Sequence, residues 1–99
     1  MMLGDKVSAH EALNLGMIYK LFPIGFFEEE VLALATTLAN MPTLALGLTK
    51  RLLNQSLTNT LEQQLALESD LQIKASSSND YKEGVTAFME KRTPEFNGN

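Results

Sequence analysis

Apolar residues recur at helical spacing along most of the chain. Residues 26–40, 42–57, 58–73 and 80–91 each place apolar side chains three or four positions apart, the period of an amphipathic helix. The apolar positions include Phe27, Val31, Leu34, Leu38, Leu44, Leu48, Leu52, Leu61, Leu65, Tyr81, Val85 and Phe88. We therefore predict four long helices. The helix over 58–73 is apolar on more than one side, so we expect it to pack between partners.

Capping residues mark the predicted helix ends. Ser8 and Glu11 have the spacing of a capping box, and Gly16 suits a left-handed stop, so a short helix is predicted between them. Ser77 with Asp80 is predicted to cap the last helix in the same way.

Short connectors join these helices. Residues 17–23 are apolar and end at Pro23, which favours an extended connector. Pro42 is expected at the first position of the next helix, and Gly47 within that helix is expected to allow close packing. Four or five helices and no set of strands predict an all-α bundle or a helical subdomain.

Composition narrows the class of protein. With 99 residues, 44% of them hydrophobic and 20% charged, the chain is typical of one small soluble domain or part of a larger one. It contains no cysteine, which excludes disulfides, a thiolate nucleophile and cysteine-based metal sites. The formal net charge of −4 provides no excess positive field, so neither nucleic acid nor an anionic membrane is expected as a partner.

Targeting signals are not apparent. The first residues lack the basic and apolar regions of a secretory leader, and no apolar run approaches the roughly 18 to 20 residues needed to span a bilayer. A cytoplasmic location is therefore the expectation.

The titratable residues are better explained by structure than by catalysis. His10 falls in the capping-box turn and is expected to face solvent. Glu62, Glu68 and Asp70 lie along a helix that needs a solvated face, and Glu28–Glu30 suit the amino end of a helix dipole. We assign no catalytic residue and no metal ligand in this sequence.

Two pairs of cations, Lys50-Arg51 and Lys91-Arg92, are the remaining candidates for ligand binding. Phe88 precedes Lys91 by three residues, so in a helix the ring and the ammonium would share a face and could hold a phosphorylated nucleotide by stacking and charge. The pattern alone favours Phe88 as a core residue and Lys91 as an exposed helix end. Both interpretations stay open on the pattern.

The two ends of the chain carry recognisable motifs. Residues 80–96 follow the pattern EG-x-x-AF-x-x-KR-x-P-x-F, which resembles the ending of the crotonase family, the enoyl-CoA hydratases and isomerases. Residues 4–18 resemble the family's G-x-x-(I/V)-SA-x-EA-x-x-(L/W)-G-(L/M)-(V/I) passage. Residues 42–50 and 59–72 are most similar to one branch, the epoxyphenylacetyl-CoA isomerases of phenylacetate degradation. The resemblance extends over essentially the whole chain.

The resemblance implies a part of an enzyme. Residues 1–99 would be the C-terminal helical, oligomerising subdomain, without the ββα spiral that carries the catalytic groups, and so inactive alone. The parent would act on acyl-CoA thioesters in phenylacetate or fatty acid metabolism, with no covalently bound cofactor. Phe88 and Lys91 would contact the adenine and phosphate end of CoA in an adjacent subunit.

Assembly follows from the same resemblance. The parent would be a trimer or a dimer of trimers, and the chain alone is expected to self-associate, in a swapped or non-native form, through its uncovered apolar faces. The alternative is an independent helical module that binds a partner protein. A DNA-binding bundle is disfavoured by the acidic balance.

Overall fold

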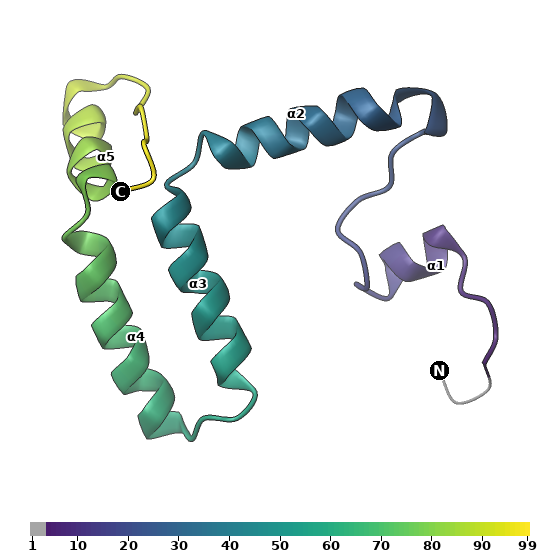
Figure 1. The fold of residues 1–99 in the computed structure, drawn as a ribbon, viewed down its shortest axis with the longest axis horizontal. Helices are drawn as coiled ribbons and strands as arrows, with labels where there is room; N and C mark the ends of the chain where they lie inside the picture. The colour runs from purple at the N-terminus through teal and green to yellow at the C-terminus, as the bar shows by residue number, and fades with distance from the viewer. Residues whose placement is uncertain (1–3) are drawn as a thin grey trace. The chain divides into compact units, whose positions relative to one another are not determined.

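The computed structural model describes residues 4–99, and all regular structure within this range is helical (Figure 1). Over these residues the α-helices are α1 (Ala9–Asn14), α2 (Phe27–Ala39), α3 (Thr43–Ser56), α4 (Leu61–Ser76) and α5 (Asn79–Glu90). A 3₁₀ turn, η1 (Ile24–Phe26), leads into α2. The predicted all-α class with four to five helices is confirmed. Met1 to Leu3, where a leader was sought, lie outside the described residues.

The chain divides into two compact units, one ending at Leu34 and the other running from Ala35 to Asn99. In the first unit, the Ser8 hydroxyl accepts the Glu11 amide at 3.2 Å while the Ser8 amide donates to Glu11 Oε2 at 2.9 Å. This is the predicted capping box of α1, and it lowers the pKa of Glu11 through the backbone and hydroxyl donors of Ser8.

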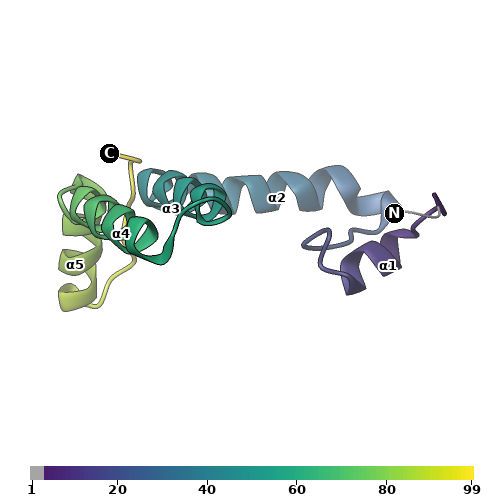
Figure 2. The ribbon, with the colours of Figure 1, turned by 90° about the horizontal axis from the view of Figure 1, so that it is seen from below.

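The second unit is built on a helix hairpin. α4 returns beside α3 in both views of the ribbon (Figures 1 and 2). Gln64 ties the hairpin at its loop: its side chain accepts from Asn59 Nδ2 at 2.9 Å and donates to the Leu52 carbonyl at 3.3 Å. α4 begins with a capping box of Thr60 and Gln63 that the sequence analysis did not predict.

Few side chains are covered in this structure. Leu48, Leu71 and Ala87 are the buried hydrophobic residues among those described, and each comes from the second unit. Asp80, at 3% exposure, is buried with them. Gly47 has open space around it, since a Cβ there would meet nothing within 4 Å. The expectation that Gly47 serves close packing is therefore wrong for this chain.

The cap of α5 differs from the prediction by one residue. Ser78, rather than Ser77, accepts the Tyr81 amide at 3.0 Å and begins the helix. The Ser77 hydroxyl instead donates to the Ile73 carbonyl at 2.8 Å, at the end of α4. Asp80 plays no part in a capping box and turns toward the end of the chain.

The connectors also differ from the prediction. Gly16 (φ 69°) ends α1 as expected, but the amide of Met17 then bonds to the Ala12 carbonyl at 2.8 Å. The chain consequently bends at residues 17–19 instead of extending. Pro42 is the N-cap of α3 and precedes its first helical residue, with its carbonyl accepting the Leu46 amide at 3.1 Å.

Membrane-spanning potential is weak over the described part of the chain. No single helix there is long and apolar enough to cross a bilayer. One bent pair of segments, Ile24–Ala39 with Thr43–Ser56, has the length and the composition of a membrane span, and only these two properties support it.

Candidate functional site

The candidate site is formed by α5 and the tail of residues 91–99 that follows it. α5 ends at Glu90, and the residue that caps it, Lys91, is left-handed with a φ of 56°. The Arg92 amide bonds to the Ala87 carbonyl at 3.0 Å and the Lys91 amide to the Phe88 carbonyl at 3.3 Å. This pair of bonds is the Schellman motif, which reverses the chain direction at a helix end. The tail can therefore run back along α5.

Asp80 holds the far end of the tail. Its two carboxylate oxygens accept the amides of Asn97 at 2.7 Å and Gly98 at 2.8 Å, and its own amide donates to the Asn99 carbonyl at 3.0 Å. A carboxylate that accepts two backbone amides keeps hydrogen-bond partners when it leaves water, which explains how Asp80 tolerates its burial. We call this arrangement the Asp80 clamp.

Glu83 holds the near end of the tail. Arg92 donates to both oxygens of the Glu83 carboxylate, at 2.6 and 2.9 Å, and the Glu95 amide donates to Glu83 Oε1 at 2.9 Å. These hydrogen bonds, from Arg92 first and then from Glu95, lower the pKa of Glu83 to about 2. Glu83 and then Glu90 raise the pKa of Arg92. We call Glu83, Arg92 and Glu95 the Glu83 clasp.

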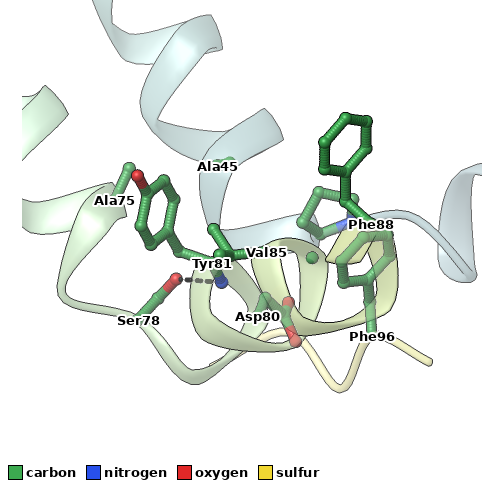
Figure 3. Close-up of a pocket in the computed structure, with 10 residues that line it drawn as sticks. Ala45, Ala75, Ser78, Asp80, Tyr81, Val85, Phe88 and Phe96 are labelled. Carbon is green, nitrogen blue, oxygen red and sulfur yellow. Dashed lines mark hydrogen bonds between the residues drawn. The ribbon is translucent and has the colours of Figure 1, made fainter. Parts of the chain in front are cut away.

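An apolar cavity of about 370 Å³ lies between α5, the tail and the amino end of α3. Tyr81, Val85 and Phe88 line it from α5, and Phe96 lines it from the tail (Figure 3). The Phe96 ring lies against Gly84, where a Cβ would be 3.6 Å from the ring. The remaining lining residues are Pro42, Ala45, Ala75, Ser78 and Asp80.

The structure changes the interpretation of Phe88 and Lys91. Phe88 is 81% exposed at the rim of the cavity, so the core role favoured by the pattern is wrong among the described residues. Lys91 lies beyond the last helical residue, Glu90, so it does not share a regular helix face with Phe88 as the spacing suggested. The two residues are near in sequence on either side of a left-handed turn.

The other candidate residues are in solvent. His10 and the acidic side chains of α2 and α4 are exposed, as expected from their positions, and so are Lys50 and Arg51. The acidic residues concerned are Glu28, Glu29, Glu30, Glu62, Glu68 and Asp70. Over residues 4–99 the side chains of His, Asp and Glu form no group of three that could hold a metal ion.

Sequence reasoning missed the clamp and the clasp. Arg92 lies nine residues after Glu83 and beyond the helix, so no helical spacing pairs them. The only signal was the family motif itself, in which Glu83, Arg92 and Phe96 occur without an evident purpose. In the structure, Arg92 of the tail pairs with Glu83 of α5, and Phe96 of the tail packs against Gly84 of α5.

Glu83, Arg92 and Phe96 belong to a motif that is typical of one family, and the chain matches that family over its whole length. The chain belongs to the enoyl-CoA hydratase/isomerase family, whose model matches residues 1–99.

Two curated relatives from Escherichia coli K12 illustrate the range within the family. The 1,2-epoxyphenylacetyl-CoA isomerase is 44% identical over 97 residues, covering 98% of this chain and 37% of the relative. The 2,3-dehydroadipyl-CoA hydratase is 36% identical over 95 residues, covering 96% of this chain and 37% of the relative. The chain thus spans little more than a third of the length of these relatives.

Solved structures agree with the sequence match. An enoyl-CoA hydratase from Polaromonas sp. JS666 superposes with a TM-score of 0.89 at 35% identity, over 98% of this chain and 38% of that one. A second, from Geobacillus kaustophilus HTA426, has a TM-score of 0.90 at 32% identity, over 99% of this chain and 37% of that one. The helical fold is therefore that of part of a crotonase-type chain.

Proposed function

We propose that the chain is the C-terminal helical subdomain of an enoyl-CoA hydratase/isomerase that acts on acyl-CoA thioesters and uses no covalently bound cofactor. The observation that carries this proposal is the coverage: the family matches residues 1–99, while the relatives are nearly three times as long. Catalysis would then depend on the remaining part of such an enzyme, with this part serving ligand contact and assembly in the cytoplasm.

The finer assignment is epoxyphenylacetyl-CoA isomerisation in phenylacetate catabolism. Its support is the 44% identity to the Escherichia coli isomerase, against 36% to the dehydroadipyl-CoA hydratase. A separate assay tests the non-catalytic role of the chain: the purified 99-residue chain is incubated with epoxyphenylacetyl-CoA and with a simple enoyl-CoA. We expect turnover of neither, and activity on either would contradict a non-catalytic role.

Phe88 and Lys91 are the proposed contacts to the nucleotide end of CoA in an adjacent subunit. An exposed ring and a cation three residues later in the sequence suit adenine and phosphate, by stacking and by charge. The nucleotide half of CoA, 3′-phosphoadenosine 5′-diphosphate, is a suitable probe, titrated into the labelled chain and followed by NMR shifts. Shifts that saturate and centre on α5 support the proposal.

The Lys91→Ala change tests the cation separately. Loss of one exposed charged contact is expected to weaken binding of the probe by about 1 kcal/mol. Lys82→Ala is the matched control, because Lys82 is an exposed lysine of α5 outside the cavity lining. Equal dissociation constants for Lys91→Ala and the unchanged chain would remove Lys91 from the site.

The second candidate function is an independent module that binds a partner protein. The exposed apolar side chains of the helices favour it, because such surfaces are rarely left open. The two functions differ in the nucleotide titration, since a plain interaction module has no reason to recognise a phosphorylated adenosine.

A further inference from the structure

The end of α5 is held in a conformation that its own residues do not favour. Lys91 has a φ of 56° and is the one non-glycine residue with positive φ among residues 4–99. A side chain in this region crowds the following carbonyl, which is why glycine normally fills such positions. A lysine stays there only when its surroundings fix the chain on both sides.

The helix fixes one side of Lys91. The amides of Lys91 and Arg92 bond back to the carbonyls of Phe88 and Ala87, the latter from a residue only 1% exposed. These bonds form only while Lys91 keeps its left-handed conformation.

The Glu83 clasp fixes the other side. The Arg92 guanidinium is held by both oxygens of Glu83, and the next fixed point is the Glu95 amide on Glu83 Oε1. A two-point bond between a planar guanidinium and a carboxylate defines direction as well as distance. The chain from Arg92 to Glu95 therefore cannot straighten while Glu83 holds it.

We propose that Glu83 and Arg92 are positioning residues that hold Lys91 in its left-handed turn and thereby aim the Lys91 ammonium relative to the Phe88 ring. This inference rests on the proposed function, in which Phe88 and Lys91 meet adenine and phosphate. Without the clasp, Lys91 relaxes to a helical or extended backbone, and its side chain leaves in another direction. The ligand can then contact the Phe88 ring or the Lys91 ammonium, but not both at once.

The experiment uses the full chain and 3′-phosphoadenosine 5′-diphosphate, with binding followed by NMR. Glu83→Gln breaks the ion pair and is expected to weaken probe binding by about as much as Lys91→Ala, roughly fivefold. Arg92→Lys keeps the charge but loses the two-point bond of the guanidinium to Glu83. Its dissociation constant for the probe should lie between those of Glu83→Gln and the unchanged chain. Glu90→Gln is the control, because it removes the other carboxylate that Arg92 contacts, at 2.7 Å, and leaves the clasp intact.

A double-mutant cycle separates positioning from general loss of structure. If Glu83 acts through Lys91, then Glu83→Gln added to Lys91→Ala has no further effect on the dissociation constant. If Glu83 matters only for folding, the two effects add, and the proposal is overturned. Amide exchange at Lys91 and Arg92 provides a probe-free readout, and it should accelerate in Glu83→Gln but not in Glu90→Gln.

Failure of this inference is distinguishable from failure of the proposed function. A chain that binds the probe but is indifferent to Glu83→Gln contradicts the positioning role and leaves the nucleotide contact standing. A chain whose α5 signals do not respond to the probe contradicts the nucleotide contact, and the positioning role fails with it.

Discussion

Asp80 shows how one side chain can organise residues distant in sequence. Its carboxylate is nearly inaccessible, yet both oxygens accept backbone amides of the tail. Such bonds to a charged acceptor are among the stronger ones in proteins, at about 1.5 to 3 kcal/mol each.

Asp80→Asn tests the clamp. The amide keeps one acceptor oxygen and turns an NH2 group toward a backbone N–H, so one of the two bonds is lost. We expect local opening to become easier by about 1.5 to 3 kcal/mol, which is roughly 10- to 100-fold faster amide exchange at Asn97 and Gly98. Asp70→Asn, at an exposed position of α4, is the control. Unchanged exchange would mean that the clamp does not hold the tail.

The lowered pKa of Glu83 indicates how the stability of the second unit changes in acid. Its pKa lies near 2 in the folded chain and at an ordinary 4.5 when the clasp is absent, so the unfolded state binds more protons between these values. The stabilisation is therefore complete above about pH 4.5 and is lost as pH falls toward 2. A carboxyl-carbon NMR titration should place the Glu83 midpoint near 2, and Arg92→Gln should raise it. A midpoint near 4.5 in the unchanged chain would show that the clasp is open in solution.

Two glycines, Gly84 inside α5 and Gly98 near the end of the tail, should respond oppositely to substitution by alanine. Gly84→Ala places a methyl 3.6 Å from the Phe96 ring, an ordinary contact, within a helix that alanine favours by about 0.5 to 1 kcal/mol. Gly98→Ala places a methyl 2.5 Å from Thr43 Oγ1 at a φ of 77°. In thermal unfolding, the midpoint temperature of Gly84→Ala should equal or exceed that of the unchanged chain, and that of Gly98→Ala should be lower. The reverse order would contradict the described path of the tail.

Helices could be predicted from the sequence better than their ends. The periodicity located α2 to α5, because apolar residues three or four positions apart form a stripe only if the segment is a helix. Three consecutive serines hid the cap of α5, since each could accept an amide of the first turn. In the structure, the Ser76 and Ser77 hydroxyls donate to the Ile73 carbonyl, and only Ser78 of the three accepts the Tyr81 amide. The left-handed Lys91 was beyond prediction, because it depends on Glu83, Arg92 and the returning tail. The site therefore required contacts that spacing does not encode.

The molecule leaves much apolar surface uncovered. In the second unit, Leu53, Leu57 and Leu61 are 65%, 87% and 71% exposed, although each lies on or next to the α3–α4 hairpin. Extensive exposed apolar surface often marks a site of contact with other protein. This exposure supports the proposed function, in which these helices are part of a longer enzyme.

Self-association is the expected result for the isolated chain. Light scattering should give a mass well above the 10.9 kDa of one copy, falling when Leu57→Lys puts a charge on the exposed surface. Asn54→Lys, the same addition of one positive charge at an exposed polar position of α3, is the control for electrostatic effects. A monodisperse monomer would contradict the prediction.

The Glu83 clasp has a practical consequence for limited proteolysis. Trypsin cleaves after lysine and arginine by taking the extended side chain into its specificity pocket, and Lys91-Arg92 is such a site. While Glu83 binds the Arg92 guanidinium and Lys91 stays in its left-handed turn, the backbone at this site is not extended. Neither side chain can then enter the specificity pocket of the protease. The rate of tryptic cleavage at this dipeptide would therefore report directly on whether the clasp is closed.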